Sequence, residues 1–281
     1  MGPIEEQTVL VTGSTDGIGM ITARKLAQMG AGVLVHGRSR EKCAATVKAI
    51  REDTGSEKLS YYVGDLSSLA AVQDLARAIQ SDHSRLDVLI NNAGVGPGAA
   101  SGGNQPLSKD GHELLFAVNY LAPYLLSHLL MPVLRRSAPA RIVNVSSAAQ
   151  ESIDFNDVML ERSYDPMQAY ARSKLALTMF TFDLAEQIQA DEITSNCLHP
   201  GSLLDTKMVR DFAPPQGSAE SGAEVEIYVA TASDLQGLTG VYFEEKQAAR
   251  AHDQAYDREA RQKLRRIGKE LTGFDSFSIR N

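Results

Sequence analysis

Short runs of aliphatic and β-branched residues alternate along the chain with longer segments whose apolar positions recur every three or four residues. The short runs have the length and composition of strands buried on both faces of a parallel sheet. Such runs occupy residues 8–12, 32–36, 59–63, 86–90, 140–145, 193–198 and 240–243. This alternation predicts an α/β fold: one Rossmann-like, doubly wound parallel sheet of about seven strands flanked by helices.

The segments between the strands predict the helices and the loops. Leu69, Val72, Leu75 and Ile79 show the helical spacing clearly. Helices are predicted after residue 17, over residues 39–53 and 69–79, in a region that ends at residue 136, and over residues 170–189 and 223–233. A charged helical tail is predicted at 251–272. Polar, Gly- and Pro-rich stretches predict loops at 95–108 and 148–166 and a mobile substrate loop at 202–222. No second domain or internal repeat is visible, so residues 1–281 are expected to form one domain.

Composition narrows the functional classes. With 281 residues, 43% hydrophobic and 22% charged, the chain can build a large core. A net charge of -7 argues against general binding to nucleic acid or anionic membranes. Cys43 and Cys197 are far apart and no ligand-spaced histidines occur, so neither a disulfide framework nor a metal site is predicted. Free thiols, no signal-peptide pattern and no apolar run near 18 residues predict a cytoplasmic protein without a transmembrane segment.

A glycine-rich turn follows the first predicted strand. It reads Gly13-Ser14-Thr15-Asp16-Gly17-Ile18-Gly19 and leads directly into a helix. A strand, a tight glycine turn and a helix N-terminus together place backbone N–H groups and the helix dipole around a phosphate. The sequence therefore predicts a nucleotide site, although a glycine turn without a ligand has the same local pattern.

The residue after the second strand bears on the choice between the two nicotinamide cofactors. An acid there binds the ribose hydroxyls of NAD, whereas a base accommodates the 2′-phosphate of NADP. The chain reads Gly37-Arg38-Ser39-Arg40, which favours NADP(H), with Arg38 pairing with the phosphate and Ser39 assisting. Asp16 in the glycine loop opposes this interpretation, so NAD(H) remains the alternative.

Polar and small residues also follow the next strands. Asp65-Leu66 ends the third strand, where the acid has two interpretations: a bond to an adenine amino group, or a cap on the next helix. Asn91-Asn92-Ala93-Gly94 ends the fourth strand, and its small residues would let a ligand approach the backbone. Asn119 lies off the apolar stripe of its helix, which suggests either an ordinary satisfied amide or a backbone opened to a water.

The strongest chemical pattern is Tyr170-Ala171-Arg172-Ser173-Lys174. Residues four apart share a helix face, so Tyr170 and Lys174 can point into one cleft. An adjacent ammonium would lower the pKa of the phenol and make Tyr170 a general acid/base. A half-buried Tyr beside a solvated Lys is the alternative, because the pair alone occurs in many helices. Ser146 and Ser147 lie at the end of the fifth strand, at the same edge of the sheet.

Together these motifs resemble the short-chain dehydrogenase/reductase family over nearly the whole chain, and most closely its retinol-dehydrogenase-like branch. The branch resemblance rests on Arg141-Ile-Val-Asn-Val-Ser-Ser and on the long separation between Ser147 and Tyr170. The resemblance implies NAD(P)(H)-dependent oxidoreduction of a carbonyl or alcohol. It does not identify the substrate.

The family resemblance also implies roles for individual residues. Ser147 would polarise the substrate oxygen, Tyr170 would exchange a proton with it, and Lys174 would bind the nicotinamide ribose. Asn119 would position a water next to Lys174. The cofactor would also contact residues after the fourth and sixth strands: Asn92, Ala93, Gly94, Pro200, Gly201 and Thr206. Thr206 departs from the family spacing by one residue, so its role is the least determined.

Two other functional classes are considered. A catalytically silent nucleotide-binding sensor or scaffold could share this fold, but it would not need Ser147, Tyr170 and Lys174 together. A serine hydrolase is disfavoured because the chain lacks Gly-x-Ser-x-Gly and Ser147 has no evident His partner. The sequence leaves the substrate, the reaction direction and homo-oligomerisation open.

Overall fold

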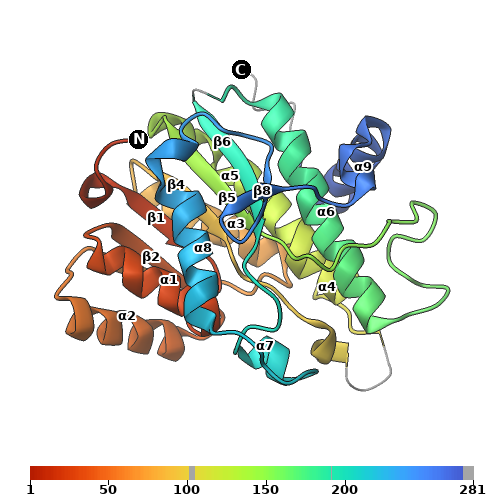
Figure 1. Cartoon of the computed structure of the whole chain (residues 1–281), viewed down its shortest axis with the longest axis horizontal. Coiled ribbons are helices and arrows are strands. Elements are labelled where there is room, and N and C mark those ends of the chain that lie inside the picture. The colour runs from red at the N-terminus through yellow and green to blue at the C-terminus, as the bar shows by residue number, and fades with distance from the viewer. Residues whose placement is uncertain (101–104, 191, 275–281) are drawn as a thin grey trace.

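A single sheet organises residues 1–100, 105–190 and 192–274, the part of the chain that the structure, a computed structural model, describes (Figure 1). Its strands lie in the order β3-β2-β1-β4-β5-β6-β7-β8. Seven strands are parallel, and β8 pairs antiparallel with β7. The strands are β1 (Thr8–Val11), β2 (Gly32–Gly37), β3 (Leu59–Val63), β4 (Val88–Asn91), β5 (Ala140–Val145), β6 (Ile193–His199), β7 (Tyr242–Glu244) and β8 (Gln247–Ala249). The predicted doubly wound α/β fold is confirmed.

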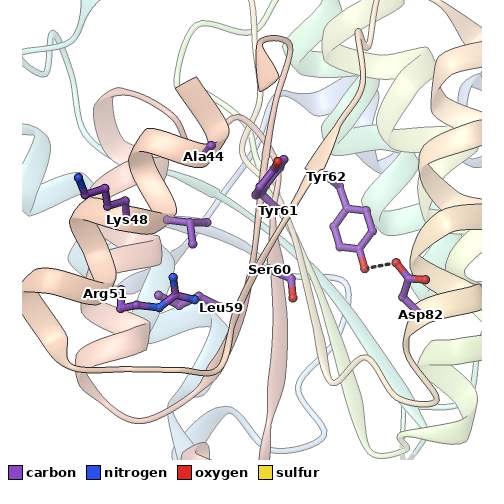
Figure 2. A pocket seen from close by; sticks show the side chains of 9 residues that line it. Ala44, Lys48, Arg51, Leu59, Ser60, Tyr61, Tyr62 and Asp82 are labelled. Carbon is purple, nitrogen blue, oxygen red and sulfur yellow. Dashed lines mark hydrogen bonds between the residues drawn. The ribbon is translucent and has the colours of Figure 1, made fainter. Parts of the chain in front are cut away.

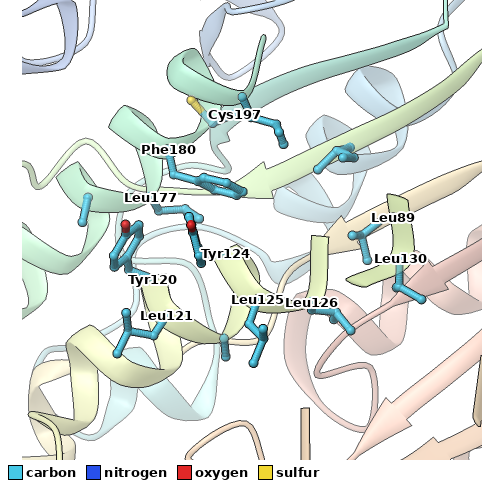
Figure 3. Close-up of a cluster of buried hydrophobic side chains, with 14 of the residues drawn as sticks. Leu89, Tyr120, Leu121, Tyr124, Leu125, Leu126, Leu130, Leu177, Phe180 and Cys197 are labelled. Atoms are coloured by element: carbon cyan, nitrogen blue, oxygen red, sulfur yellow. The ribbon is translucent and has the colours of Figure 1, made fainter. Parts of the chain in front are cut away.

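Alternate strand residues point into two apolar layers. Val9 and Val11 face the layer covered by α1 (Gly17–Gln28), α2 (Arg40–Thr54) and α8 (Ala219–Thr231). Leu10 faces the opposite layer, covered by α3 (Leu69–Asp82), α5 (Ala122–Arg136) and α6 (Pro166–Gln187). Figure 3 shows part of this second layer, where aromatic and leucine side chains of α5 and α6 meet below the sheet. Burial on both faces explains why the strands are continuously apolar.

A long helical stretch, Leu114–Arg136, is the one helix in the described part of the chain that is both long and strongly apolar. It comprises α4 (Leu114–Phe116), the π-helical segment η3 (Ala117–Leu121) and α5. Length and composition would allow it to cross a membrane, but 89% of its most apolar window is buried inside the fold. Packing in the core is sufficient to explain this composition.

The C-terminal helix α9 (Arg258–Thr272) packs against α6 and against the π-helical segment η3, which leads into α5. The hydroxyl of Tyr120 donates to the backbone oxygen of Leu264 at 3.1 Å, and Arg265 pairs with Asp183 at 3.3 Å. The tail of the chain therefore covers part of the apolar surface in this region. The sequence alone left this surface open to another subunit.

The structure differs from the sequence predictions at several element boundaries. The strand β8 was not predicted, because three polar and small residues give no strand pattern. Residues 202–222 are not only loop: α7 (Lys207–Arg210) lies within them, and α8 already begins at Ala219. Its cap, Ser218, accepts from the N–H of Ser221, a signal that apolar periodicity does not carry. Part of the predicted 95–108 loop, residues 101–104, lies outside the described residues.

Candidate active site

The glycine loop joins β1 to α1 at the point where the sheet order reverses. Gly13 has φ +66° and Gly17 φ +54°, a backbone region that favours glycine. A Cβ on Gly13 would lie 2.8 Å from the Cα of Ala93, and one on Gly19 would lie 2.2 Å from the amide nitrogen of Asn92. These glycines thus let the loop pack against the end of β4. The same amide nitrogen donates to the backbone oxygen of Thr12 at 2.7 Å, which joins the two segments.

Sequence reasoning missed His36, which holds this loop from below. Its Nδ1 accepts from the N–H of Gly13 at 3.1 Å, and its Nε2 lies 3.1 Å from the backbone oxygen of Gly64. Because Nδ1 accepts, the proton of the neutral ring lies on Nε2 and is donated to Gly64. Burial lowers the pKa of His36 to about 4, so the ring is neutral at pH 7. The imidazole thereby links β2, the glycine loop and the end of β3.

Two side chains of the loop have local partners. Ser14 is fully buried; its hydroxyl donates to the backbone oxygen of Val11 at 2.8 Å and accepts from the N–H of His36 at 3.0 Å. Ser14 therefore holds the loop's shape. Asp16 is exposed and caps α1, with Oδ1 accepting from the N–H of Gly17 at 2.7 Å. This places a negative charge beside the helix N-terminus that would receive a phosphate.

The end of β2 carries the residues predicted to select the cofactor. Arg38 is exposed there. The hydroxyl of Ser39 caps α2 and donates to the carboxylate of Glu41 at 2.7 Å. Sequence reasoning found no acid at residues 37–40 and missed Glu41, which the first turn of α2 brings back to Ser39. That carboxylate competes with a phosphate for the Ser39 hydroxyl.

Asp65 lies at the end of β3, where its carboxylate accepts from the hydroxyl of Ser67 at 2.8 Å and pairs with Lys109 at 3.0 Å. The alternative that Asp65 caps the following helix is wrong, since Ser68 is the cap of α3 and accepts from the N–H of Ala71. Leu66 is buried beside it and belongs to the core.

Asn119 lies in the π-helical segment, a type of helix irregularity common at functional sites. Its Oδ1 accepts from the N–H of Val95 at 2.8 Å, and its Nδ2 donates to the oxygen of Val95 at 3.0 Å and to the hydroxyl of Ser173 at 2.9 Å. The amide thus fixes the segment after β4 and joins it to the helix that carries Tyr170 and Lys174. A Cβ on Gly94 would lie 3.3 Å from Oδ1 of Asn119 and 3.5 Å from Nζ of Lys174, so the amide and the ammonium border the same space.

Ser147, Tyr170 and Lys174 meet at the carboxyl end of β5. Nζ of Lys174 lies 5.7 Å from the centroid of the Tyr170 ring and donates to the backbone oxygen of Val145 at 2.8 Å. Burial lowers the pKa of Lys174 to about 8, partly opposed by the charge of Glu226. Burial raises the pKa of Tyr170, and its hydrogen bond with Ser147 partly offsets this. The pKa of Tyr170 is therefore raised and not lowered as the sequence predicted, because desolvation of the phenol is the largest effect.

The segment after β6 approaches the glycine loop from the other side. Gly201 has φ +130°, a conformation that side chains rarely adopt, directly after Pro200. Thr206 caps α7, and its methyl group lies 3.5 Å from the position of a Cβ on Gly17. Thr206 therefore lies beside the glycine loop, and its contact with the cofactor stays a prediction.

A cavity of about 520 Å³ lies elsewhere, between α2 and the edge strand β3 (Figure 2). It is lined by Ala44, Val47, Lys48, Arg51, Leu59, Ser60, Tyr61, Tyr62 and Asp82. None of these is a predicted site residue, so the cavity is separate from the predicted active site. In the described part of the chain no cluster of side chains suits a metal ion.

The predicted residues thus converge on the crevice at the carboxyl edge of the sheet, where open parallel sheets bind ligands. They fit a nicotinamide dinucleotide: the N-terminus of α1 can receive its diphosphate, Arg38 is exposed at the adenosine end, and Lys174 lies at the opposite end. Such a crevice defines a Rossmann-type oxidoreductase.

Comparison with known proteins gives the family. Residues 7–217 match the model of the short chain dehydrogenase family, and the chain belongs to that family. It is 34% identical to human retinol dehydrogenase 13, over 99% of this chain and 88% of that protein. It is 35% identical to mouse polyprenol dehydrogenase, over 96% and 85%. The resemblance to retinol dehydrogenases and the assignment as an oxidoreductase of alcohol or carbonyl groups are confirmed.

Solved structures of similar fold agree with this family assignment. An uncharacterised protein from Mycobacterium paratuberculosis superimposes with a TM-score of 0.77 at 27% identity, over 96% of this chain and 94% of that one. Pseudomonas aeruginosa RhlG, solved as an NADP active-site complex, gives a TM-score of 0.70 at 30% identity, over 87% and 97%.

Proposed function

We propose that this chain is an NADP(H)-preferring dehydrogenase/reductase that interconverts an apolar alcohol and its carbonyl compound. The observation that carries the proposal is the convergence of Ser147, Tyr170 and Lys174 at the carboxyl end of β5. A silent nucleotide-binding protein would not need a phenol, a hydroxyl and a desolvated ammonium around one space.

The protein supplies position and proton transfer. In the direction of reduction, Ser147 donates a hydrogen bond to the carbonyl oxygen, and Tyr170 gives that oxygen its proton. When bound, the nicotinamide supplies or accepts the hydride. Lys174 holds the ribose and provides positive charge beside the phenol as the proton leaves. Asn119 keeps the Val95 segment and the Tyr170 helix in register and borders the space next to Lys174.

The NADP(H) preference rests on Arg38, which is exposed at the end of β2 and free to meet a 2′-phosphate. Two acids act against it, Asp16 at the N-terminus of α1 and Glu41 on Ser39. The relative RhlG, solved with NADP, supports the assignment.

The apolar substrate is proposed on two grounds. Tyr170 belongs to an apolar cluster whose other members are Val95, Leu114, Leu115, Leu160, Tyr164 and Ala169. The relatives named above are a retinol dehydrogenase and a polyprenol dehydrogenase, whose names denote long isoprenoid alcohols. A long apolar chain would gain by burying its surface against the partly buried members of this cluster, which are Val95, Leu114, Tyr164 and Tyr170.

A calorimetric titration with NADPH and NADH tests the cofactor, and turnover of retinal against a small polar aldehyde tests the substrate. NADPH is expected to bind more tightly, and the variant Arg38→Ala should lose most of that difference, while Glu41→Gln should increase it. Equal binding of the two cofactors, unchanged in Arg38→Ala, would reject the preference. Binding of neither would reject the enzyme itself.

A further inference from the structure

The short helix α7 lies across the crevice between the glycine loop and the end of β4. At one side the methyl group of Thr206 lies 3.5 Å from the Cβ position of Gly17. At the other side, the terminal carbon of Met208 lies 3.6 Å from the Cβ position of Gly94. In Figure 1, α7 is seen at the edge of the molecule below α1 and α8. The segment therefore contacts both the glycine loop and the segment that follows β4.

This closure depends on the absence of side chains beneath α7. A Cβ on Gly96 would lie 2.5 Å from Cγ and 3.2 Å from Sδ of Met208, and one on Gly98 would lie 2.8 Å from Cβ of Asp211. Carbon atoms do not approach this closely without displacement. Gly96 has an ordinary negative or extended φ, so only its contact with Met208 excludes a methyl group there.

Met208 is the residue of α7 that reaches the reaction centre. The Cβ position of Gly94 lies 3.5 Å from Nζ of Lys174, 3.3 Å from Oδ1 of Asn119 and 3.6 Å from the methyl group of Met208. An apolar, half-buried thioether thus faces the ammonium and the amide across one small space. An apolar wall at this place excludes water and strengthens the electrostatic interactions of Lys174.

We propose that Met208 is a positioning residue of the reaction. Its side chain packs on Gly96, holds α7 over the reaction centre and presents an apolar wall to the substrate. The proposal rests on the proposed function for its effect on turnover, but the seating itself is independent of any activity. A flexible thioether can follow substrates of different apolar shape, which suits a long hydrocarbon chain.

The test is a double-mutant cycle between Gly96→Ala and Met208→Ala, read by trypsin cleavage within α7 of the full chain. Lys207 and Arg210 are exposed on this helix, so their cleavage, followed by mass spectrometry of the fragments, reports how firmly it is seated. Gly96→Ala is expected to speed cleavage at least about fivefold, since overpacking unseats the helix. In the Met208→Ala background the same change should alter cleavage less than about twofold, because the shorter side chain leaves room for the methyl group.

Controls and kinetics separate seating from general damage. Gly32→Ala, whose methyl group would meet only ordinary contacts, and Met29→Ala, at an exposed methionine of α1, should leave the cleavage of α7 unchanged. Met208→Ala should raise KM for the apolar aldehyde more than it lowers kcat.

Two results would overturn the proposal: an equal effect of Gly96→Ala in both backgrounds, or no effect of it in either. If Gly96→Ala does not fold, Met208→Ala alone tests the proposal. Loss of the Met208 side chain from its contact with Gly96 must then speed cleavage of α7 relative to Met29→Ala. If no aldehyde is turned over, the proposed function fails while the cleavage cycle still tests the seating.

Discussion

Lys174 donates a hydrogen bond from its ammonium to the backbone oxygen of Val145, at 2.8 Å, where β5 ends. This bond fixes the side chain of Lys174, which is buried beside Tyr170 at the carboxyl edge of the sheet. Burial costs the charged form solvation and brings the pKa of Lys174 to about 8. The protonation of Lys174 therefore changes near neutral pH, which the sequence alone did not indicate.

The first prediction is an alkaline limit to carbonyl reduction. Lys174 is charged below pH 8 and loses its proton as the pH rises through about 8, so kcat/KM for reduction should fall about tenfold per pH unit above that value. In Lys174→Arg, provided that this variant retains turnover, the alkaline fall in kcat/KM should move to higher pH, because the guanidinium keeps its charge. A pH–rate profile between pH 6 and 10 makes the measurement. A fall in kcat/KM that begins only near the ordinary lysine pKa would contradict the prediction.

The second prediction concerns the proton relay. Tyr170→Phe should lower kcat by about 10²–10⁴-fold through loss of the general acid, while the Kd of NADPH stays within about twofold. Ser147→Ala should move the acid limb of kcat/KM for oxidation to higher pH. The hydrogen bond from Ser147 opposes the rise in the pKa of Tyr170, and oxidation requires the phenolate. A pH profile of oxidation makes the measurement, and an unshifted limb would assign Ser147 to substrate polarisation alone.

The third prediction concerns His36. Replacing it with Phe leaves the N–H of Gly13 and the oxygen of Gly64 without their partner, which should lower the free energy of unfolding by about 2–4 kcal/mol at pH 7. It should also weaken NADPH binding, because the glycine loop loses its support. His112→Phe, at a partly exposed histidine outside the loop, is the control.

The pH dependence of that loss gives a sharper test. The folded pKa of His36, about 4, lies below its unfolded value of 6.5. The unfolded chain therefore binds the proton first, and the stability contributed by the neutral ring is complete above pH 6.5 and is lost as the pH falls toward 4. The difference between wild type and His36→Phe in urea denaturation should shrink over this range. A constant difference would show that the ring does not titrate with a lowered pKa.

The sequence was sufficient to predict the seven parallel strands, most of the helices and the order of the motifs. Strand and helix patterns are local, and in a parallel sheet all strand ends that follow the motifs reach one edge. Ser147 and Tyr170, far apart in the sequence, could therefore be placed together before any coordinates.

The remaining features depend on contacts that no local pattern encodes. His36 reads as an ordinary strand residue until the register of β2 brings it beneath Gly13. Glu41 affects the cofactor site only because the first turn of α2 returns it to Ser39. The helix α7 has four residues, too few for a periodic signal, yet it covers the crevice. The lowered pKa expected for Tyr170 was wrong, because the sequence does not show how far the fold removes the phenol from solvent.

The last prediction concerns a buried acid behind the site. Glu226 of α8 is fully buried, and its Oε2 accepts from the hydroxyl of Thr22 of α1 at 2.8 Å. Burial raises its pKa to about 8, although the Thr22 bond and the charge of Lys174 oppose this. At pH 7 the folded protein therefore holds a proton on Glu226 that the unfolded chain has released.

This difference makes the wild type less stable as the pH rises. Below pH 4.5 both states bind the proton; between pH 4.5 and about 8 only the folded state does, so the free energy of unfolding falls with pH over that range. Glu226→Gln keeps the shape and removes the titration. Its stability relative to wild type should rise with pH by about 3–5 kcal/mol in total and level off above pH 8. Glu224→Gln, at an exposed acid of the same helix paired with Lys25, should show no such rise in stability relative to wild type over this pH range. Urea denaturation at pH 5, 7 and 9 makes the comparison, and parallel pH profiles for wild type and Glu226→Gln would mean that Glu226 is ionised within the fold.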